Sequence, residues 1–273
     1  MANETCVRTF NSLNSFYNYI CTTQINEAYE HRELRSHAEY PSFTRFSKTN
    51  NFDEAVNLFK NGWDTMSKEL ETRLKAECKN IVPVKQHKNV LSVRGYQPVV
   101  PLYLAGIPQN MIEKQFVVKK QKVIEISKSI SYPSTCKASE IIEESIKALV
   151  IVKKLEAQGY RIKLNIVLGL AEGAFKSSRG KKIICKVCIK KPNERMNVSK
   201  LSFPLVHPSM LRRLFFRYIE VDPEVTDKMS SNYGYPLLAD ELKNAFTGDI
   251  IIPDILNCKA DDVNSIDELI AKS

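Results

Sequence analysis

Three serines spaced two residues apart follow one of the clearest strand patterns of the chain. The stretch 123–126 predicts a strand, and Ser127, Ser129 and Ser131 come directly after it, before a long amphipathic helix. Ligands of α/β sheets bind at the carboxyl ends of strands, so this run is a candidate ligand or metal loop. Divalent cations prefer carboxylate oxygens, and hydroxyls are poorer ligands. The alternative is that the serines satisfy backbone groups near the helix start.

Two cysteines three residues apart, Cys185 and Cys188, have the spacing of half a zinc site. No second Cys or His pair follows at a suitable distance, and His207 stands alone. Residues three apart in a strand point to opposite faces. We therefore expect these cysteines to be small buried hydrophobic residues rather than metal or redox groups.

Basic residues gather in three segments: before the strand at 123, at a predicted turn near 180, and on a helix that also carries Phe215, Phe216 and Tyr218. Arginine and aromatic side chains together suit single-stranded nucleic acid, because bases stack on rings while phosphates meet the positive charge. The alternative is that the charges are solvated and the rings lie in the core. The candidate nucleic-acid-binding residues are Lys119, Lys120, Lys122, Arg179, Lys181, Lys182, Arg212, Arg213 and Arg217.

Common catalytic motifs are absent from the sequence. There is no nucleophile elbow, dinucleotide-binding glycine pattern or phosphate loop. The four histidines show no metal-ligand spacing apart from a loose pair, His31 and His37, and Glu143-Glu144 lies on an amphipathic helix. We therefore expect a protein that is not an enzyme and that needs no cofactor.

The composition is that of a chain with a packed core. Hydrophobic residues make up 43% of the 273 residues, and the formal net charge is +9. A positive field of this size attracts polyanions, of which nucleic acid is the commonest. Seven scattered cysteines, an odd number, do not suggest a disulfide framework. No apolar run has the roughly 20 residues of a membrane helix, so we expect a cytoplasmic protein that contacts no membrane.

The order of elements predicts an α/β fold. A strand before 127, a helix over 138–158 and a strand over 160–168 form a parallel, right-handed crossover. The next strand, 182–190, follows a short turn and is expected to be antiparallel. We predict a Rossmann-like, mostly parallel sheet with one antiparallel edge strand. The expected divisions are an N-terminal helical arm over 1–40, a helical and loop region packed on the core over 41–115, and the α/β core over 116–273.

The serine run resembles the Asp-x-Ser-x-Ser metal signature of von Willebrand A domains, and the order of elements around it is similar to theirs. Ser127 stands where that family has its first Asp. Asp254 would match its second acidic position. The resemblance implies a degenerate von Willebrand A-like core whose metal site is reduced to Ser127, Ser129, Ser131 and Asp254.

Several further stretches resemble an uncharacterised family of tailed-phage proteins. They include Phe43-Thr44-Arg45-Phe46, Asn61-Gly62-Trp63, Tyr103 to Pro108, His207 to Arg213 and Gly248-Asp249-Ile250. Size, charge and layout are more distantly similar to the single-stranded-DNA-binding transcription cofactors of phages related to coliphage N4. These resemblances imply a phage-encoded protein whose partners include nucleic acid and a phage or host protein such as RNA polymerase.

Three functions remain open on the sequence. The first is a nucleic-acid-binding protein that prefers single-stranded DNA and acts in phage transcription or replication. The second is a protein-interaction module for phage assembly or host takeover. The third is a nuclease or nucleotide-modifying enzyme, which requires acidic groups such as Asp249 or Asp254 to converge near Ser127.

Overall fold

The main body of the protein is built on one mixed sheet with the strand order β1-β7-β6-β5-β9. The computed structural model describes residues 4–30, 33–79, 87–116, 122–173, 180–228, 233–238, 240–242 and 249–252. The strands of this sheet are β1 (Glu4–Phe10), β5 (Val123–Ser129), β6 (Arg161–Ala171), β7 (Lys181–Lys190), β8 (Tyr235–Pro236) and β9 (Ile250–Ile252). The short β8 pairs with the end of β6, beyond the last residue of β5.

Strand direction changes once along this sheet. β5 is parallel to both β6 and β9, β7 is antiparallel to β6, and β1 is parallel to β7. The structure therefore confirms a mixed α/β fold with mostly parallel pairing and an antiparallel strand after β6. It differs in one respect: β7 is not at the edge of the sheet, because β1 pairs along its outer side.

The N-terminal segment corrects the expectation of a helical arm over 1–40. Residues 4–10 form β1, whose side chains alternate between buried and exposed: Cys6 and Phe10 face the core, whereas Val7 is 54% exposed. The helical spacing begins only at α1 (Leu13–Thr22), where Ser12 caps the helix. The N-terminal residues thus belong to the main sheet, and the core does not begin at 116.

The predicted crossover between the two central strands is present. α7 (Ala138–Ala157) connects β5 to β6, buries Leu149, Val152 and Leu155, and is followed by Gly159 at φ +93°. β6 is almost wholly buried from its second residue onward, as expected for a central strand covered on both faces.

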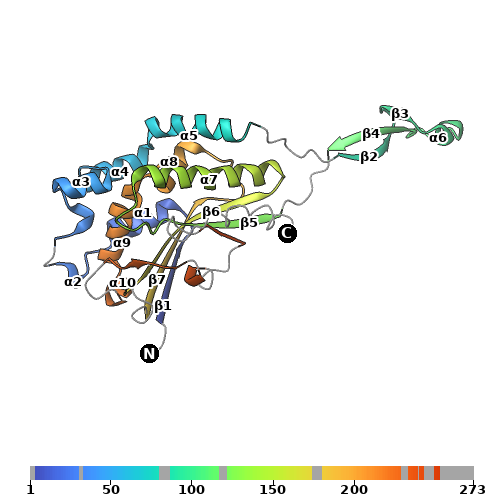
Figure 1. Cartoon of the computed structure of the whole chain (residues 1–273). Helices are drawn as coiled ribbons and strands as arrows, with labels where there is room; N and C mark the ends of the chain where they lie inside the picture. The colour runs from blue at the N-terminus through green and yellow to red at the C-terminus, as the bar shows by residue number, and fades with distance from the viewer. Residues whose placement is uncertain are drawn as a thin grey trace.

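Helices α5, α7 and α8 form a layer that is visible across the top of the main body in Figure 1. The opposite face of the sheet carries a smaller cluster in which Val167 and Ile184 pack with Leu237 and Leu242. The other helical segments of the main body are α2 (Glu27–Glu30), η1 (Arg35–His37), α3 (Pro41–Ser47), α4 (Phe52–Asn61), α5 (Asp64–Glu77), α8 (Val198–Val206), the π-helical η3 (Met210–Phe215), α9 (Phe216–Val221) and α10 (Pro223–Lys228). No helix among the described residues is both long and apolar enough to cross a bilayer.

Residues 87–116 form a separate three-stranded sheet with the order β2-β4-β3. It consists of β2 (His87–Ser92), β3 (Gln97–Pro98), the short helix α6 (Val100–Leu104) and β4 (Met111–Phe116). Figure 1 shows it standing away from the main sheet. The expected loop region over 41–115 is therefore divided: helices α3, α4 and α5 belong to the main body, whereas the residues from 87 onward make a sheet of their own.

Candidate nucleic-acid interface

The serine run does not form an open ligand loop. Ser127, Ser129 and Ser131 are at most 1% exposed. The Ser131 Oγ accepts a 2.7 Å hydrogen bond from the Gly169 amide, and the Ser129 Oγ accepts one from the Ser131 amide. The hydroxyls of Ser129 and Ser131 therefore serve the backbone, as in the alternative reading. Asp254 lies outside the described residues.

A buried ammonium carries the charge beside these serines. The Lys128 Nζ lies 2.9 Å from the Glu144 carboxylate, 2.7 Å from the Ser129 carbonyl and 5.3 Å from the centre of the Tyr132 ring. Burial opposes this charge, but Tyr132 and Glu144 outweigh it and raise the pKa of Lys128. Within the described parts of the chain, no group of three His, Cys, Asp or Glu residues is placed to hold a metal ion.

The two cysteines of β7 are both buried, as expected. Burial raises the pKa of the Cys185 thiol well above its usual value and also raises that of Cys188. These thiols therefore stay protonated, which is the opposite of what a metal ligand or nucleophile requires.

Two of the predicted nucleic-acid-binding arginines are interior residues, which corrects that assignment. Arg212 is 3% exposed and Arg213 is fully buried. The Arg213 guanidinium donates to the carbonyls of Ser36, Ala38, Thr49 and Asn50. The Arg213 guanidinium is thus occupied by backbone oxygens, and burial keeps both arginines away from phosphates.

The guanidinium groups of Arg212 and Arg217 also donate to backbone carbonyls. The Arg212 guanidinium donates to the Phe46 carbonyl at 2.6 Å and lies 3.6 Å over the centre of the Phe46 ring. Burial lowers the pKa of Arg212 to about 10. The half-buried Arg217 donates to the Ile20 carbonyl at 3.3 Å. The alternative that aromatic residues here belong to the core is confirmed, since Phe215 and Tyr218 are fully buried.

The remaining predicted residues that the structure describes do not gather on one surface. Lys119, Lys120 and Arg179 lie outside the described residues. Lys122 precedes β5 beside the start of β6, whereas Lys181 and Lys182 begin β7 beside the end of β6. The length of β6 separates these positions by roughly 30 Å. Lys182 also forms a 2.9 Å ion pair with Glu241.

A hollow of about 700 Å³ lies where β1 and β7 end. Because β1 and β7 are parallel, their carboxyl ends meet at one edge of the sheet. The walls are the first residues of α1, the last residues of α4, the end of β7 and the first residues of α8. Crevices at the carboxyl ends of strands are the usual ligand sites of α/β sheets, and pockets of about 300–1,000 Å³ hold small ligands.

Two helix N-termini border this hollow. Ser12 caps α1 and Asn197 caps α8, each accepting from one backbone amide of the first turn. Neither helix has an acidic residue in its first turn. The positive ends of both helix dipoles are therefore not neutralised within their own helices, and amides such as those of Leu13 and Ser199 have no partner within the helix.

Lysines make the hollow basic. Lys60, Lys191 and Lys200 are exposed at its walls. Lys190 also lines the hollow, but its charge is balanced by Glu156 at 2.7 Å. Glu194, the one acidic residue among the described residues of the wall, accepts a 3.3 Å hydrogen bond from the Lys191 amide.

An aromatic pair forms part of the same wall. The half-buried rings of Tyr17 and Phe59 are stacked, with centroids 5.2 Å apart and planes 19° apart. The Lys60 ammonium lies 5.2 Å from the centre of the Tyr17 ring. Phe203 meets Phe59 edge to face from the floor of the hollow. A planar ligand and an anionic group would thus both find complementary surfaces here.

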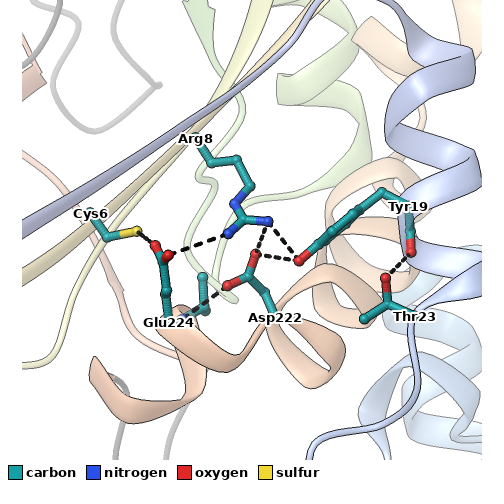
Figure 2. Close-up of polar contacts among 7 residues, drawn as sticks. Cys6, Arg8, Tyr19, Thr23, Asp222 and Glu224 are labelled. Atoms are coloured by element: carbon teal, nitrogen blue, oxygen red, sulfur yellow. Dashed lines mark hydrogen bonds and ion pairs between the residues drawn. The ribbon is translucent and has the colours of Figure 1, made fainter.

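A polar network holds α1 in the orientation that the hollow requires (Figure 2). The Tyr19 hydroxyl accepts from Arg8 at 2.7 Å and donates to Asp222 at 2.9 Å, and Arg8 pairs with Asp222 at 3.1 Å. Glu224 accepts a hydrogen bond from the Cys6 thiol. Burial, reinforced by Asp222, raises the pKa of Tyr19 to about 12, so this tyrosine remains a neutral donor.

Sequence reasoning missed the residues of the hollow. Lys60 lies in the last turn of a helix, Lys191 directly follows a strand and Lys200 lies in the first turn of a helix, so they are dispersed along the sequence. The adjacent Lys190-Lys191 pair at a strand end was the only local signal. Their proximity depends on the pairing of β1 with β7, which joins segments more than 170 residues apart.

Comparison with known proteins gives one match. The profile of a domain of unknown function, DUF7192, matches residues 2–272. This chain belongs to the DUF7192 family. No curated protein and no solved structure matches the chain significantly. This match assigns the chain to a family and gives it no activity.

Proposed function

We propose that this DUF7192 protein is a non-enzymatic nucleic-acid-binding protein that prefers single strands. The observation that carries the proposal is the basic hollow, in which Lys60, Lys191 and Lys200 surround the stacked pair of Tyr17 and Phe59. Lysines and helix N-termini supply the electrostatic contacts to phosphates. The aromatic wall supplies a surface on which bases stack, and this contact tolerates any sequence.

The shape of the site favours single strands over duplexes. Bases of a duplex have both faces covered by their neighbours, so only an unpaired base can present a face to Tyr17 or Phe59. A base that enters a hollow of about 700 Å³ must also leave its own stack. Duplex DNA would meet only the lysines and would bind through its backbone alone.

The biological setting is part of the same proposal. The resemblance to tailed-phage proteins and to phage transcription cofactors favours a role in phage transcription or replication, with RNA polymerase as a candidate protein partner. Free cysteines throughout the described chain fit the reducing cytoplasm of a host cell. The β5–α7–β6 crossover followed by antiparallel β7 supports a von Willebrand A-like or Rossmann-like ancestry for the core.

Fluorescence anisotropy over a salt series tests the proposal. The probes are end-labelled single-stranded DNA, the matching duplex and single-stranded RNA. The test variant is K60E/K191E/K200E, and the matched control, K68E/K147E/K153E, reverses three exposed lysines of α5 and α7 that do not line the hollow. Both variants change the net charge equally, so only a local effect separates them.

We expect the wild type to prefer single strands and the test variant to lose affinity by about 100-fold, since each lost phosphate contact is worth roughly 1 kcal/mol. The salt slope of its binding constant should fall by about 2, as three contacts at about 0.7 each predict. The control should bind like the wild type. Equal losses in both variants, or no binding by the wild type at low salt, would refute the site.

At one of these positions the substitution does not weaken the fold. Lys200 is the third residue of α8, where an acidic side chain favours the helix dipole and completes a capping box with Asn197. The single variant K200E should therefore unfold at the same or a higher temperature while binding more weakly. Thermal unfolding measured beside the binding assay separates the two effects.

A further inference from the structure

The small sheet of residues 87–116 has no core of its own. None of residues 87–115 is buried. Its surface carries seven of the large hydrophobic side chains that the described chain exposes. These are Leu91, Val93, Tyr96, Val100, Tyr103, Leu104 and Ile107, which are between 41% and 79% exposed. Large exposed apolar patches mark interaction surfaces, and the described part of the chain leaves this one uncovered.

The apolar side chains have a definite arrangement. Val100, Tyr103 and Leu104 lie three and four residues apart on α6 and form one stripe. In the sheet, Leu91 pairs with Ile112 on one face. Strand alternation puts Lys114 on the same face as Ile112, and Val90 pairs with Glu113 on the other face. Exposed apolar side chains thus lie both on α6 and on the sheet, with few charged residues among them.

The exposed area has the size of a dimer interface. With roughly 150–250 Å² for each large side chain, the exposed fractions of the seven residues add up to about 800 Å². A standard stable interface buries about 800 Å² on each partner. One such unit facing an equal unit would therefore bury enough surface for a specific association.

The charge of the unit fits a second copy better than nucleic acid. Residues 87–116 contain only three basic residues and one acidic residue. Arg94 pairs with Glu113, and the Lys114 ammonium lies over the Tyr96 ring at 5.1 Å. The main body of a chain with net charge +9 repels another copy. The apolar surface of residues 87–116 is nearly neutral. The same surfaces of two copies can therefore pack together without such repulsion.

We propose that two copies of this chain dimerise through residues 87–116. The contact is isologous, so that the α6 stripe and the Leu91 face of each copy cover the same surfaces of the other. The basic hollow lies on the main body, at the end of β1 and β7, and remains open in each copy. This proposal does not depend on the function assigned to the hollow.

Sedimentation velocity of the full chain tests the dimer, with the double variant Y103E/L104E as the probe. Both side chains are exposed, at 67% and 79%, so their replacement removes no internal contact. The matched control is V7E, which places an acid at an apolar position of the main body that is 54% exposed.

The wild type and V7E should sediment as dimers at micromolar concentration, in both low and high salt. The dissociation constant of Y103E/L104E should rise by about 100-fold or more, because two central apolar residues become charged. The proposal is overturned if the wild type is still a monomer at a concentration 100-fold above the micromolar range. It is also overturned if Y103E/L104E dimerises as tightly as the wild type. Flotation of a monomeric wild type with phosphatidylcholine vesicles would overturn it in favour of a lipid surface. Binding of single-stranded DNA is measured with the double variant as well. If a monomeric Y103E/L104E still binds it, the outcome for the dimer is separate from the outcome for the hollow.

Discussion

His207 is a buried imidazole enclosed by aromatic rings. Its ring centre lies 4.5 Å from that of Trp63, which meets it edge to face, and 5.3 Å from that of Phe203, which stacks on it. The Nδ1 atom accepts a 3.1 Å hydrogen bond from the Ser209 amide. Burial lowers the pKa of His207 to about 4, so the folded protein holds it neutral.

This environment makes stability depend on pH. In the unfolded chain His207 has a pKa of about 6.5, so the unfolded state binds the proton first as the pH falls. The contribution is complete above pH 6.5 and is lost as the pH falls toward 4. The loss amounts to about 3 kcal/mol, at about 1.4 kcal/mol for each pKa unit. Urea unfolding of wild type and H207N between pH 7.5 and 4.5 measures it.

The asparagine of H207N retains a hydrogen-bond acceptor but does not titrate. The wild type should be more stable than H207N at pH 7.5, and the gap should narrow steadily below pH 6.5. The exposed His87 supplies the control, because H87Q should follow the wild type at every pH. A gap that is constant with pH would contradict the buried neutral imidazole.

The motif that contains His207 illustrates what single residues reveal. The stretch from His207 to Arg213 is conspicuous in the sequence, and its arginines suggest a charged surface. In the structure the Ser209 hydroxyl donates to the Ser47 carbonyl, and the Arg213 guanidinium donates to carbonyls such as that of Ala38. The motif is therefore part of the interior. The residue type identifies a donor. The location of its acceptors depends on how residues 36–50 fold against η3, and the sequence does not show this.

At the scale of elements, η1 and α3 depend on Arg213 for their position. The segment from Ser36 to Asn50 contributes few buried apolar side chains, and its turns present backbone carbonyls to the interior. Four of these carbonyls and the Thr49 hydroxyl accept from one guanidinium. The Arg213 guanidinium also lies 4.9 Å from the centre of the Phe43 ring.

Replacing this side chain with an apolar one should therefore release the segment. R213M leaves several buried carbonyls without donors, at about 1–3 kcal/mol each, and should lower the free energy of unfolding by about 3 kcal/mol or more. Hydrogen exchange should become faster first in residues 33–50. The exposed Arg195 is the control, and R195M should change stability by no more than about 0.5 kcal/mol. A similarly small effect of R213M would contradict the interior role.

The elements that could be predicted are those defined by local patterns. α7 has an unbroken apolar stripe that ends before Gly159, and β5 and β6 are short apolar runs on either side of it, so the crossover follows from sequence. β1 was not predicted, because its seven-residue alternation is short and lies beside a stronger helical pattern. Such a segment is identified as a strand only through its pairing with β7, which the sequence does not show. In the sheet of β2, β3 and β4 the sequence suggests only one short strand, over 90–93, because nearby prolines such as Pro98 and Pro101 favour loops. In the structure Pro98 ends β3 and Pro101 lies in the first turn of α6.

At the scale of the molecule, the candidate site exists only after the sheet has formed. Its walls come from α1, α4, α8 and the end of β7, which the sequence separates widely. The net charge of +9 suggests a polyanion as a partner to consider, but it does not say where such a partner would bind. Among the described basic residues that are conspicuous in the sequence, the arginines of residues 212–217 contact the interior and Lys182 forms an ion pair. Lys122 lies far from Lys181 and Lys182 along β6.

The molecule thus presents two surfaces with different chemistry. The hollow is basic and carries a stacked aromatic pair, whereas residues 87–116 are apolar and nearly neutral. Binding at the first should weaken with salt, because ions compete for phosphates. Association through the second should be nearly insensitive to salt, because it removes apolar surface from water. Salt dependence therefore distinguishes the two surfaces in the intact protein.

Photo-crosslinking tests the central claim most directly, because it reports where the nucleic acid lies. A single-stranded oligonucleotide containing 5-iodouracil is irradiated with the wild-type chain at low salt, and crosslinked peptides are identified by mass spectrometry. The account predicts crosslinks to Tyr17 or Phe59, because stacked aromatic residues are the favoured acceptors, and their loss in K60E/K191E/K200E but not in K68E/K147E/K153E. Crosslinks confined to residues 87–116, or equal yields in both variants, would contradict it.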